Sequence, residues 1–209
     1  MKKAALKKYG LNFCSKKAPD KTDASCCNIQ FFICIPSDLV LLAQAHQQPN
    51  ADLFLPNKIL PELLKAFQVI HLCGKGKMDE TLKGTEGYVQ YEYIKEELPD
   101  LFALSDVVIS RAGANAICEI SALHKPNLLI PLSANASRGD QILNARSFEK
   151  QGFSMVLEEE EITDEKLLDT IHQLYDNRHS FEEAMSAGKQ MDSIHHIVSL
   201  IEECVLSKK

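Results

Sequence analysis

Short apolar runs alternate with amphipathic stretches from residue 56 to residue 176, which predicts strands that alternate with helices. Apolar runs predict strands at residues 68–73, 106–110, 128–131 and 154–157, and the alternating stretch 89–94 predicts a further strand. Apolar positions at helical spacing predict helices at 61–67, 98–104 and 114–124, and another from Asp140. This order predicts the α/β class, with a largely parallel, Rossmann-like sheet flanked by helices.

The two ends of the chain are less regular than its middle. In the first 50 residues we expect a strand at 29–35, a helix at 39–45 and a turn at 47–50. We therefore treat residues 1–50 as an unassigned extension and residues 51–209 as one domain. Near the other end, Thr163 is placed to cap a helix, and two closing helices are expected at 181–189 and 191–204.

The central unit runs from Asp106 to Ala145 and reads as strand, turn, helix, strand, loop and helix. The first turn is Arg111-Ala112-Gly113, and the later polar loop covers residues 133–139. Ligands of parallel α/β sheets bind at the carboxyl ends of the strands, where such loops meet helix N-termini. These two loops are therefore the candidate binding region.

Gly113 stands where a strand passes into a helix, and it has two interpretations. A glycine there lets a ligand approach the backbone and leaves the helix N-terminus, with its free N–H groups, open to a phosphate. It also makes a turn with no ligand involved, and one glycine by itself favours this simpler interpretation.

Polar residues on the two following helices are candidates for sugar recognition. The Glu119 carboxylate suits a ribose diol, or else it is a solvated group near a helix N-terminus. Asp140 is a candidate N-cap, and the Gln141 amide suits sugar hydroxyls. Asn144 shares a face with Gln141, but a hydrogen bond from helix to loop is its favoured interpretation.

Composition narrows the class of partner. The formal charge is −6 and tryptophan is absent, which argues against nucleic acid. The seven cysteines form no C-x-x-C pair, so we expect reduced thiols in a cytoplasmic protein, with Cys118 packed inside its helix. No P-loop and no Asp-x-Asp pair is present, so neither a metal nor a cofactor is expected. His71, in a strand, is expected to be a core histidine rather than a base.

Four segments together resemble the C-terminal half of the MurG family. They are HLCGKG (71–76), YVQYEYIKEELPDLFALSDVVISRAGANAICEI (88–120), KPNLLIPL (125–132) and ASRGDQILNARSFEKQGF (136–153). The specific part is R-A-G-x-N-x-x-x-E followed by R-G-D-Q-x-x-N-A. This family adds N-acetylglucosamine to the lipid-linked muramyl-pentapeptide precursor of peptidoglycan.

The resemblance implies a GT-B fold of two Rossmann-like halves, of which this half holds the donor, UDP-GlcNAc. It implies that the backbone of Ile94 meets the uracil, and that Arg111 and Gly113 shape the turn. It implies a ribose contact for Glu119. Gln141, together with Asp140, is the implied contact of the N-acetylglucosamine hydroxyls. The helix N-terminus facing the diphosphate is the remaining implied contact, supplied by Ala114, Asn115 and Ala116.

The resemblance also has gaps. The family has a G-G-S-x-G loop that meets the donor phosphate, and the corresponding region here reads QQPNADLFLPN (47–57). The acceptor half, with its base, is not covered, so we assign no catalytic residue and expect no transfer from this chain alone. A separate acceptor domain or chain at the inner membrane face is the implied partner. The alternatives are a non-catalytic nucleotide-sugar-binding module, a vestigial one, and an unrelated nucleotide-binding regulator.

Overall fold

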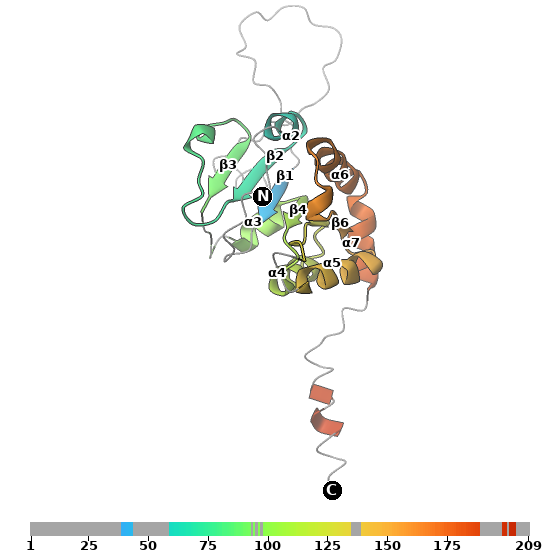
Figure 1. Cartoon of the computed structure of the whole chain (residues 1–209). Helices are drawn as coiled ribbons and strands as arrows, with labels where there is room; N and C mark the ends of the chain where they lie inside the picture. The colour runs from blue at the N-terminus through green and yellow to red at the C-terminus, as the bar shows by residue number, and fades with distance from the viewer. Residues whose placement is uncertain are drawn as a thin grey trace, which may run out of the picture.

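A single parallel sheet organises the domain in the computed structural model, which describes residues 39–43, 59–92, 94, 96, 98–134, 139–188, 198–199 and 201–203. Its six strands are in the order β3-β2-β1-β4-β5-β6, and every pair is parallel (Figure 1). The strands are β1 Leu39–Ala43, β2 Gln68–Leu72, β3 Tyr88–Tyr91, β4 Val107–Ser110, β5 Asn127–Leu129 and β6 Met155–Val156. This order reverses direction between β1 and β4, which is the position where sheets of this kind hold ligands.

Helices cover both faces of the sheet, as the α/β prediction required. They are α2 Leu60–Ala66, α3 Leu98–Leu104, α4 Ala114–Ala122, α5 Asp140–Lys150, α6 Asp164–Asp176 and α7 Arg178–Ala187. Two short 3-10 turns, η2 Glu80–Leu82 and η3 Glu159–Glu161, complete the described elements. The α/β class with a Rossmann-like parallel sheet is therefore confirmed.

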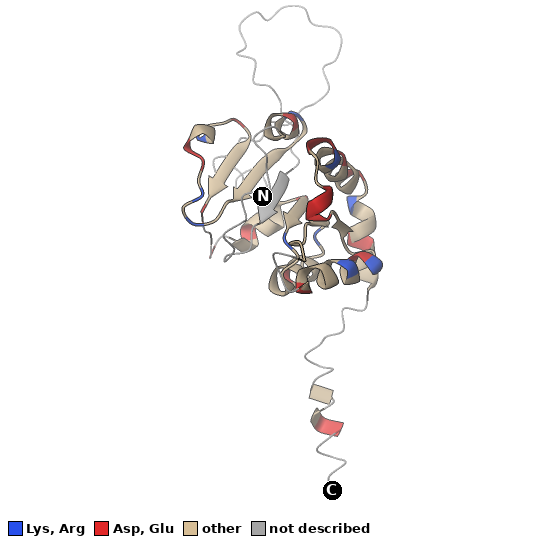
Figure 2. Cartoon of the chain, viewed as in Figure 1, with Lys and Arg blue, Asp and Glu red and all other residues tan. Residues whose placement is uncertain are grey.

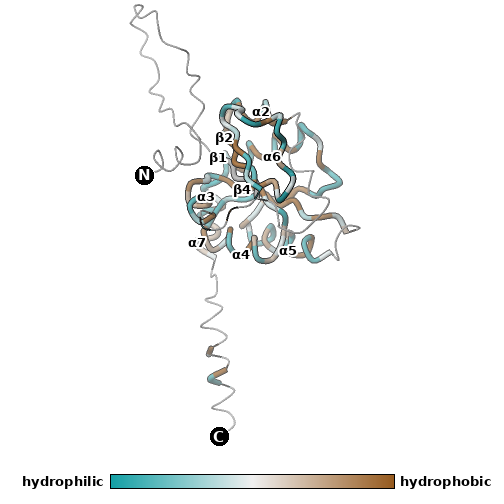
Figure 3. The backbone as a smooth tube through the Cα atoms, turned by 90° about the vertical axis from the view of Figure 1, so that its left-hand side faces the viewer, coloured by the Kyte–Doolittle hydropathy of each residue, from teal (hydrophilic) through white to brown (hydrophobic). Residues whose placement is uncertain are grey.

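Alternate residues of strands β2, β4 and β5 face opposite sides of the sheet and pack in three clusters. Val69, Ile109 and Leu128 point toward α2 and α6, and pack in the largest cluster with Leu63 and Ile171. The intervening strand residues face α3, α4 and α5 and form two smaller clusters. Figure 3 shows hydrophobic positions in brown where the strands run through the centre. Because both faces of the sheet are covered, β4 is buried at all four of its positions rather than at alternate ones.

The helix expected at residues 39–45 is wrong, because residues 39–43 form strand β1. This strand lies in the centre of the sheet, where Leu41 pairs with Ile70 on one side and Val108 on the other. A short, continuous run of apolar residues such as this one has no period that separates strand from helix. The sheet therefore extends into the segment that we had set apart as an extension at residues 1–50. The strand expected at 29–35 lies outside the described residues.

Most other elements match the expectation closely. The helix at 98–104 has the predicted bounds, and the Thr163 side chain accepts a hydrogen bond from the Lys166 N–H, as expected of its cap. Helix α7 begins three residues before the expected position 181, at Arg178. Of the last expected helix, only residues 198–199 and 201–203 are described, and they are helical.

Candidate functional site

The N-terminus of α4 lies at the reversal point of the strand order. Strand β4 ends at Ser110, the turn 111–113 follows, and α4 begins at Ala114. Because β4 is hydrogen-bonded to β1, this turn is at the carboxyl edge of the two central strands. The fold thus brings the one-glycine turn to the place where a ligand of such a sheet is expected.

Gly113 is the N-cap of α4, and its backbone has φ −70° and ψ 136°. Any residue adopts these angles, so the turn itself does not require glycine. A Cβ built at Gly113 meets no atom of the described residues within 4 Å, so these neighbours do not require glycine either. What the missing side chain leaves is open space in front of the helix. This geometry favours the ligand interpretation over the simple turn.

The first turn of α4 offers three backbone donors. The first N–H bonded within the helix is that of Ile117, which donates to Gly113 O at 3.0 Å. The N–H groups of Ala114, Asn115 and Ala116 precede it and have no partner inside the helix, and no side chain caps Gly113. These three residues are the ones that the family resemblance assigns to the diphosphate, and that assignment stays a prediction.

Asn115 and Glu119 are exposed and are one helical turn apart. They lie on the face of α4 opposite its buried residues Ile117, Ile120 and Ser121. The Glu119 carboxylate is thus in the second turn of α4, on a solvent-facing side, which is compatible with a ribose diol. Cys118 is also exposed, so the expectation that it packs inside the helix is wrong.

Helix α5 begins beside α4, and both views of the backbone show the two helices adjacent (Figures 1 and 3). Its N-cap is Gly139, with φ 85° and ψ −6°, rather than Asp140. The capping role expected for Asp140 is therefore wrong: the left-handed glycine starts the helix one residue earlier, and Asp140 is an exposed residue of its first turn.

Gln141 and Asn144 both connect α5 to the neighbouring loops. The Gln141 Oε1 atom accepts a hydrogen bond from the Leu132 N–H at 3.1 Å, which leaves its amide nitrogen as the donor. Asn144 donates from Nδ2 to Ala112 O at 3.3 Å. The helix-to-loop bond expected of Asn144 is confirmed, and it ties the start of α5 to the turn before α4.

Arg111 is turned into the protein rather than toward solvent. Its side chain is 3% exposed, and its Nη2 lies 2.9 Å from Oε1 of Glu159 in η3. Its Nη1 donates to Ile130 O at 3.3 Å. Arg111 therefore supports the turn from behind, in agreement with the shaping role that the resemblance implies.

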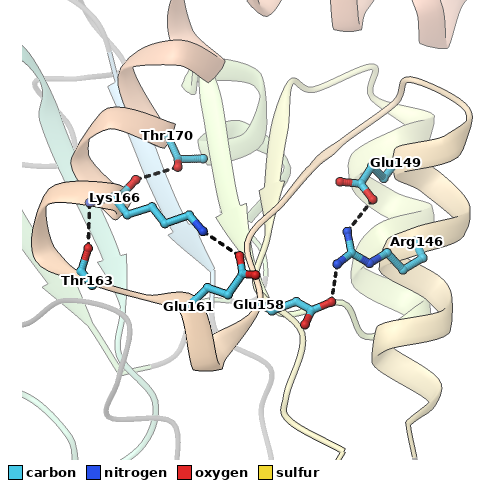
Figure 4. Close-up of polar contacts among 7 residues, drawn as sticks. All are labelled: Arg146, Glu149, Glu158, Glu161, Thr163, Lys166 and Thr170. Atoms are coloured by element: carbon cyan, nitrogen blue, oxygen red, sulfur yellow. Dashed lines mark hydrogen bonds and ion pairs between the residues drawn. The ribbon is translucent and has the colours of Figure 1, made fainter.

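Three of the four acidic residues at 158–161 pair with basic side chains. Glu159 pairs with Arg111, Glu158 with Arg146, and Glu161 with Lys166 at 2.7 Å. Figure 4 shows the last two pairs, and Figure 2 shows the acidic turn in red just before α6. No local sequence pattern predicted the ion pair of Glu159, because its partner Arg111 lies 48 residues away in the chain.

Ile94 and His71 are nearer the other edge of the sheet. The Ile94 side chain packs against the cluster of α3, which leaves its backbone as the group for a uracil contact. The Nδ1 atom of His71 lies 2.8 Å from the Tyr88 hydroxyl, and burial lowers the pKa of His71 to about 4. His71 is therefore neutral at physiological pH and belongs to the core, as expected.

The described residues contain neither a metal-binding cluster nor a membrane-crossing helix. No group of three or more His, Cys, Asp or Glu side chains in this part of the chain is arranged to hold a metal ion. Among the same residues, no helix is long and apolar enough to cross a membrane.

Comparison with curated proteins gives relatives of one name. The UDP-N-acetylglucosamine--N-acetylmuramyl-(pentapeptide) pyrophosphoryl-undecaprenol N-acetylglucosamine transferase of Lachnospira eligens is 64% identical over 145 residues, 69% of this chain and 41% of the relative. The protein of the same name from Lachnoclostridium phytofermentans is 61% identical over 145 residues, again 69% of this chain and 41% of the relative. The chain thus spans less than half the length of these relatives.

Solved structures agree on the fold. MurG of Acinetobacter baumannii superposes with a TM-score of 0.64 at 21% identity, covering 80% of this chain and 50% of that one. The kitacinnamycin glycotransferase superposes with a TM-score of 0.63 at 15% identity, covering 92% of this chain and 48% of that one. At these identities the likeness shows the fold alone, which is that of one half of a GT-B glycosyltransferase.

A family match extends over most of the sheet and its helices. It covers residues 36–198, so it includes the central strand β1 as well as the candidate site. Together with the curated relatives, this match shows that the chain belongs to the family of the glycosyltransferase family 28 C-terminal domain.

Proposed function

We propose that this chain binds UDP-GlcNAc as the donor half of an N-acetylglucosaminyltransferase. In this proposal the sugar is transferred to a lipid-linked muramyl-pentapeptide during peptidoglycan synthesis. The acceptor half, with the base that takes the proton from the acceptor hydroxyl, is supplied by a domain or chain at the cytoplasmic face of the membrane.

The observation that carries the proposal is the open N-terminus of α4. Gly113 has an ordinary backbone conformation and a Cβ there would enter empty space, directly before three N–H groups without helical partners. Such a terminus attracts a diphosphate through hydrogen bonding and the helix dipole. In the same proposal Glu119 binds the ribose hydroxyls. The amide nitrogen of Gln141, with Asp140 beside it, meets the sugar.

Titration calorimetry with two donors tests the donor assignment. We expect UDP-GlcNAc to bind more tightly than UDP-glucose, since Gln141 and Asp140 face the part of the ligand that carries the sugar. Equal affinity for UDP-GlcNAc and UDP-glucose would contradict the assignment of Gln141 and Asp140 to the sugar, but not the proposal that the chain binds the nucleotide. The absence of binding by either would overturn the proposal.

A non-catalytic sugar-nucleotide-binding or vestigial module is the second candidate. It is favoured by the segment QQPNADLFLPN (47–57), which stands where the family has a glycine-rich phosphate loop and which lies outside the described residues. An assay with the lipid-linked acceptor separates the candidates. Turnover in the presence of an added acceptor half supports the transferase, and donor binding without turnover under the same conditions supports the module.

A further inference from the structure

The loop from Ile130 to Ser133, which follows β5, is fastened at both of its ends. At one end Ile130 O accepts a hydrogen bond from Arg111 Nη1 at 3.3 Å. At the other end the Ser133 N–H donates to Glu159 Oε2 at 3.1 Å. The two residues that fasten the loop come from different strand ends, β4 and β6, so the loop cannot shift without disturbing the sheet edge.

Arg111 and Glu159 also hold each other. Their side chains are 3% and 17% exposed, and Nη2 of Arg111 lies 2.9 Å from Oε1 of Glu159. A charge this well buried is costly unless it is paired and hydrogen-bonded. Glu159 therefore uses one carboxylate oxygen for the guanidinium and the other for the Ser133 N–H. A group with a single acceptor cannot do both.

The same loop sets the orientation of Gln141. Between the two fastened ends, the Leu132 N–H donates to Gln141 Oε1 at 3.1 Å. With its oxygen held in this way, the side-chain amide presents its nitrogen as a donor. The position of that nitrogen depends on Leu132, and the position of Leu132 depends on Arg111 and Glu159.

The turn that carries Glu159 is also tied to the helix that carries Gln141. Arg146 of α5 pairs with Glu158, the residue before Glu159, and with Glu149 of its own helix at 2.7 Å (Figure 4). These pairs are partly exposed and contribute little stability individually. Of the two pairs, Arg146–Glu158 joins the segments, and it brings the residue before η3 next to α5.

We infer that Glu159 is a positioning residue for donor recognition. It holds the Ile130–Ser133 loop so that Gln141 presents its amide nitrogen to the sugar of the nucleotide. The inference rests on the proposed function, because it assigns Gln141 to the sugar. It adds a residue that is not itself in contact with the donor and that acts on discrimination between UDP-GlcNAc and UDP.

Calorimetry on Glu159→Gln tests the inference through a ratio of affinities. We expect the preference for UDP-GlcNAc over UDP to fall by up to about tenfold, the upper end for loss of one hydrogen bond between neutral groups, here the Gln141 amide and a sugar hydroxyl, with the UDP affinity itself changed little. A merely structural role would lower the melting temperature and leave the ratio unchanged. Glu160→Gln is the matched control, because Glu160 is the next residue of the same turn and is exposed.

The inference is overturned if Glu159→Gln keeps the wild-type ratio, or if Glu160→Gln loses it equally. A second measurement needs no variant: hydrogen exchange of the wild-type protein without ligand. Protection of the Ser133 amide supports the contact with Glu159, and exchange at the rate of an open loop contradicts it. If wild type binds neither nucleotide while Ser133 is protected, the proposed function fails and the loop contact stands, so the two failures are distinguishable.

Discussion

Helices α4 and α5 both begin at a glycine, but the two glycines have different backbones. Gly113, before α4, has φ −70°, whereas Gly139, before α5, has φ 85°. A Cβ at either position meets no atom within 4 Å. The left-handed angle is sufficient reason for glycine at 139, because L side chains are strained there. At position 113 the angle suits any residue. The remaining reason for glycine there is the space that a side chain would fill.

The comparison separates two uses of glycine that look identical in the sequence. At α5 the glycine is needed for the backbone conformation that connects the polar loop to the helix. At α4 it leaves open the approach to three N–H groups that have no partner inside the helix, which suits a ligand. A substitution at each position therefore affects a different measurable quantity, and the contrast can be tested directly.

Gly113→Ala has the largest expected effect. We expect UDP-GlcNAc to bind at least about a hundredfold more weakly, because the methyl group keeps the diphosphate from more than one N–H donor and each hydrogen bond to a charged group contributes about 1.5–3 kcal/mol. The free energy of unfolding should change by less than about 1 kcal/mol, since the backbone angles suit alanine and the lost N-cap preference is small. Calorimetry and urea unfolding measure the two quantities. A stable variant with wild-type affinity would remove the ligand role of this glycine.

The pH dependence of stability tests whether the effects of the two glycines are confined to the helix starts. Burial lowers the pKa of His71 from 6.5 to about 4, so the unfolded chain takes up a proton at a pH where the folded protein does not. Stability contributed by neutral His71 is full above pH 6.5 and falls by up to about 3 kcal/mol as the pH drops toward 4.

Urea unfolding at pH 7 and pH 4.5, with His71→Gln as the reference, isolates this contribution. The acid loss should be the same in wild type, Gly113→Ala and Gly139→Ala, because independent distant sites add. A different loss in one glycine variant would show that the helix start is coupled to β2.

Gly139→Ala should behave in the opposite way to Gly113→Ala. Holding alanine in the left-handed region costs about 1–2 kcal/mol, so the free energy of unfolding falls by that amount. Nucleotide binding, measured well below the melting temperature, should stay within a few fold of wild type for UDP. If Gly139→Ala leaves the free energy of unfolding unchanged, the claim that the backbone angle requires glycine at position 139 is wrong.

The smallest expected effect is at Glu119, on the exposed face of α4. Glu119→Ala should weaken UDP binding about tenfold, through loss of a charged acceptor for the ribose hydroxyls. It should leave 2′-deoxy-UDP less affected, since that nucleotide lacks one of the hydroxyls. Cys118→Ala, in the same turn and also exposed, is the control and should bind like wild type. An equal loss for both nucleotides would argue against a ribose contact.

Local pattern accounts for what could be predicted here, and distance along the chain accounts for most of what could not. The helix at 98–104 and the Thr163 cap follow from spacing and side-chain chemistry within one or two turns. The role of Glu159 depends on partners 48 and 26 residues away. Strand β1 consists of apolar residues only, so it lacks the alternation that would have identified it as a strand.

The two helix starts show a further limit of sequence reasoning. The expectation that Asp140 caps α5 followed residue preference, but the cap position is decided by the backbone angle at Gly139, which sequence alone did not supply. At Gly113 the sequence left two interpretations open, and the angle with the empty space around it distinguishes them.

A structure of the chain with UDP bound tests the central claim most directly. We predict phosphate oxygens about 2.7–3.2 Å from the N–H groups of Ala114, Asn115 or Ala116, with the ligand occupying the space in front of Gly113. A nucleotide bound elsewhere, with that space filled by the protein itself, would contradict the account.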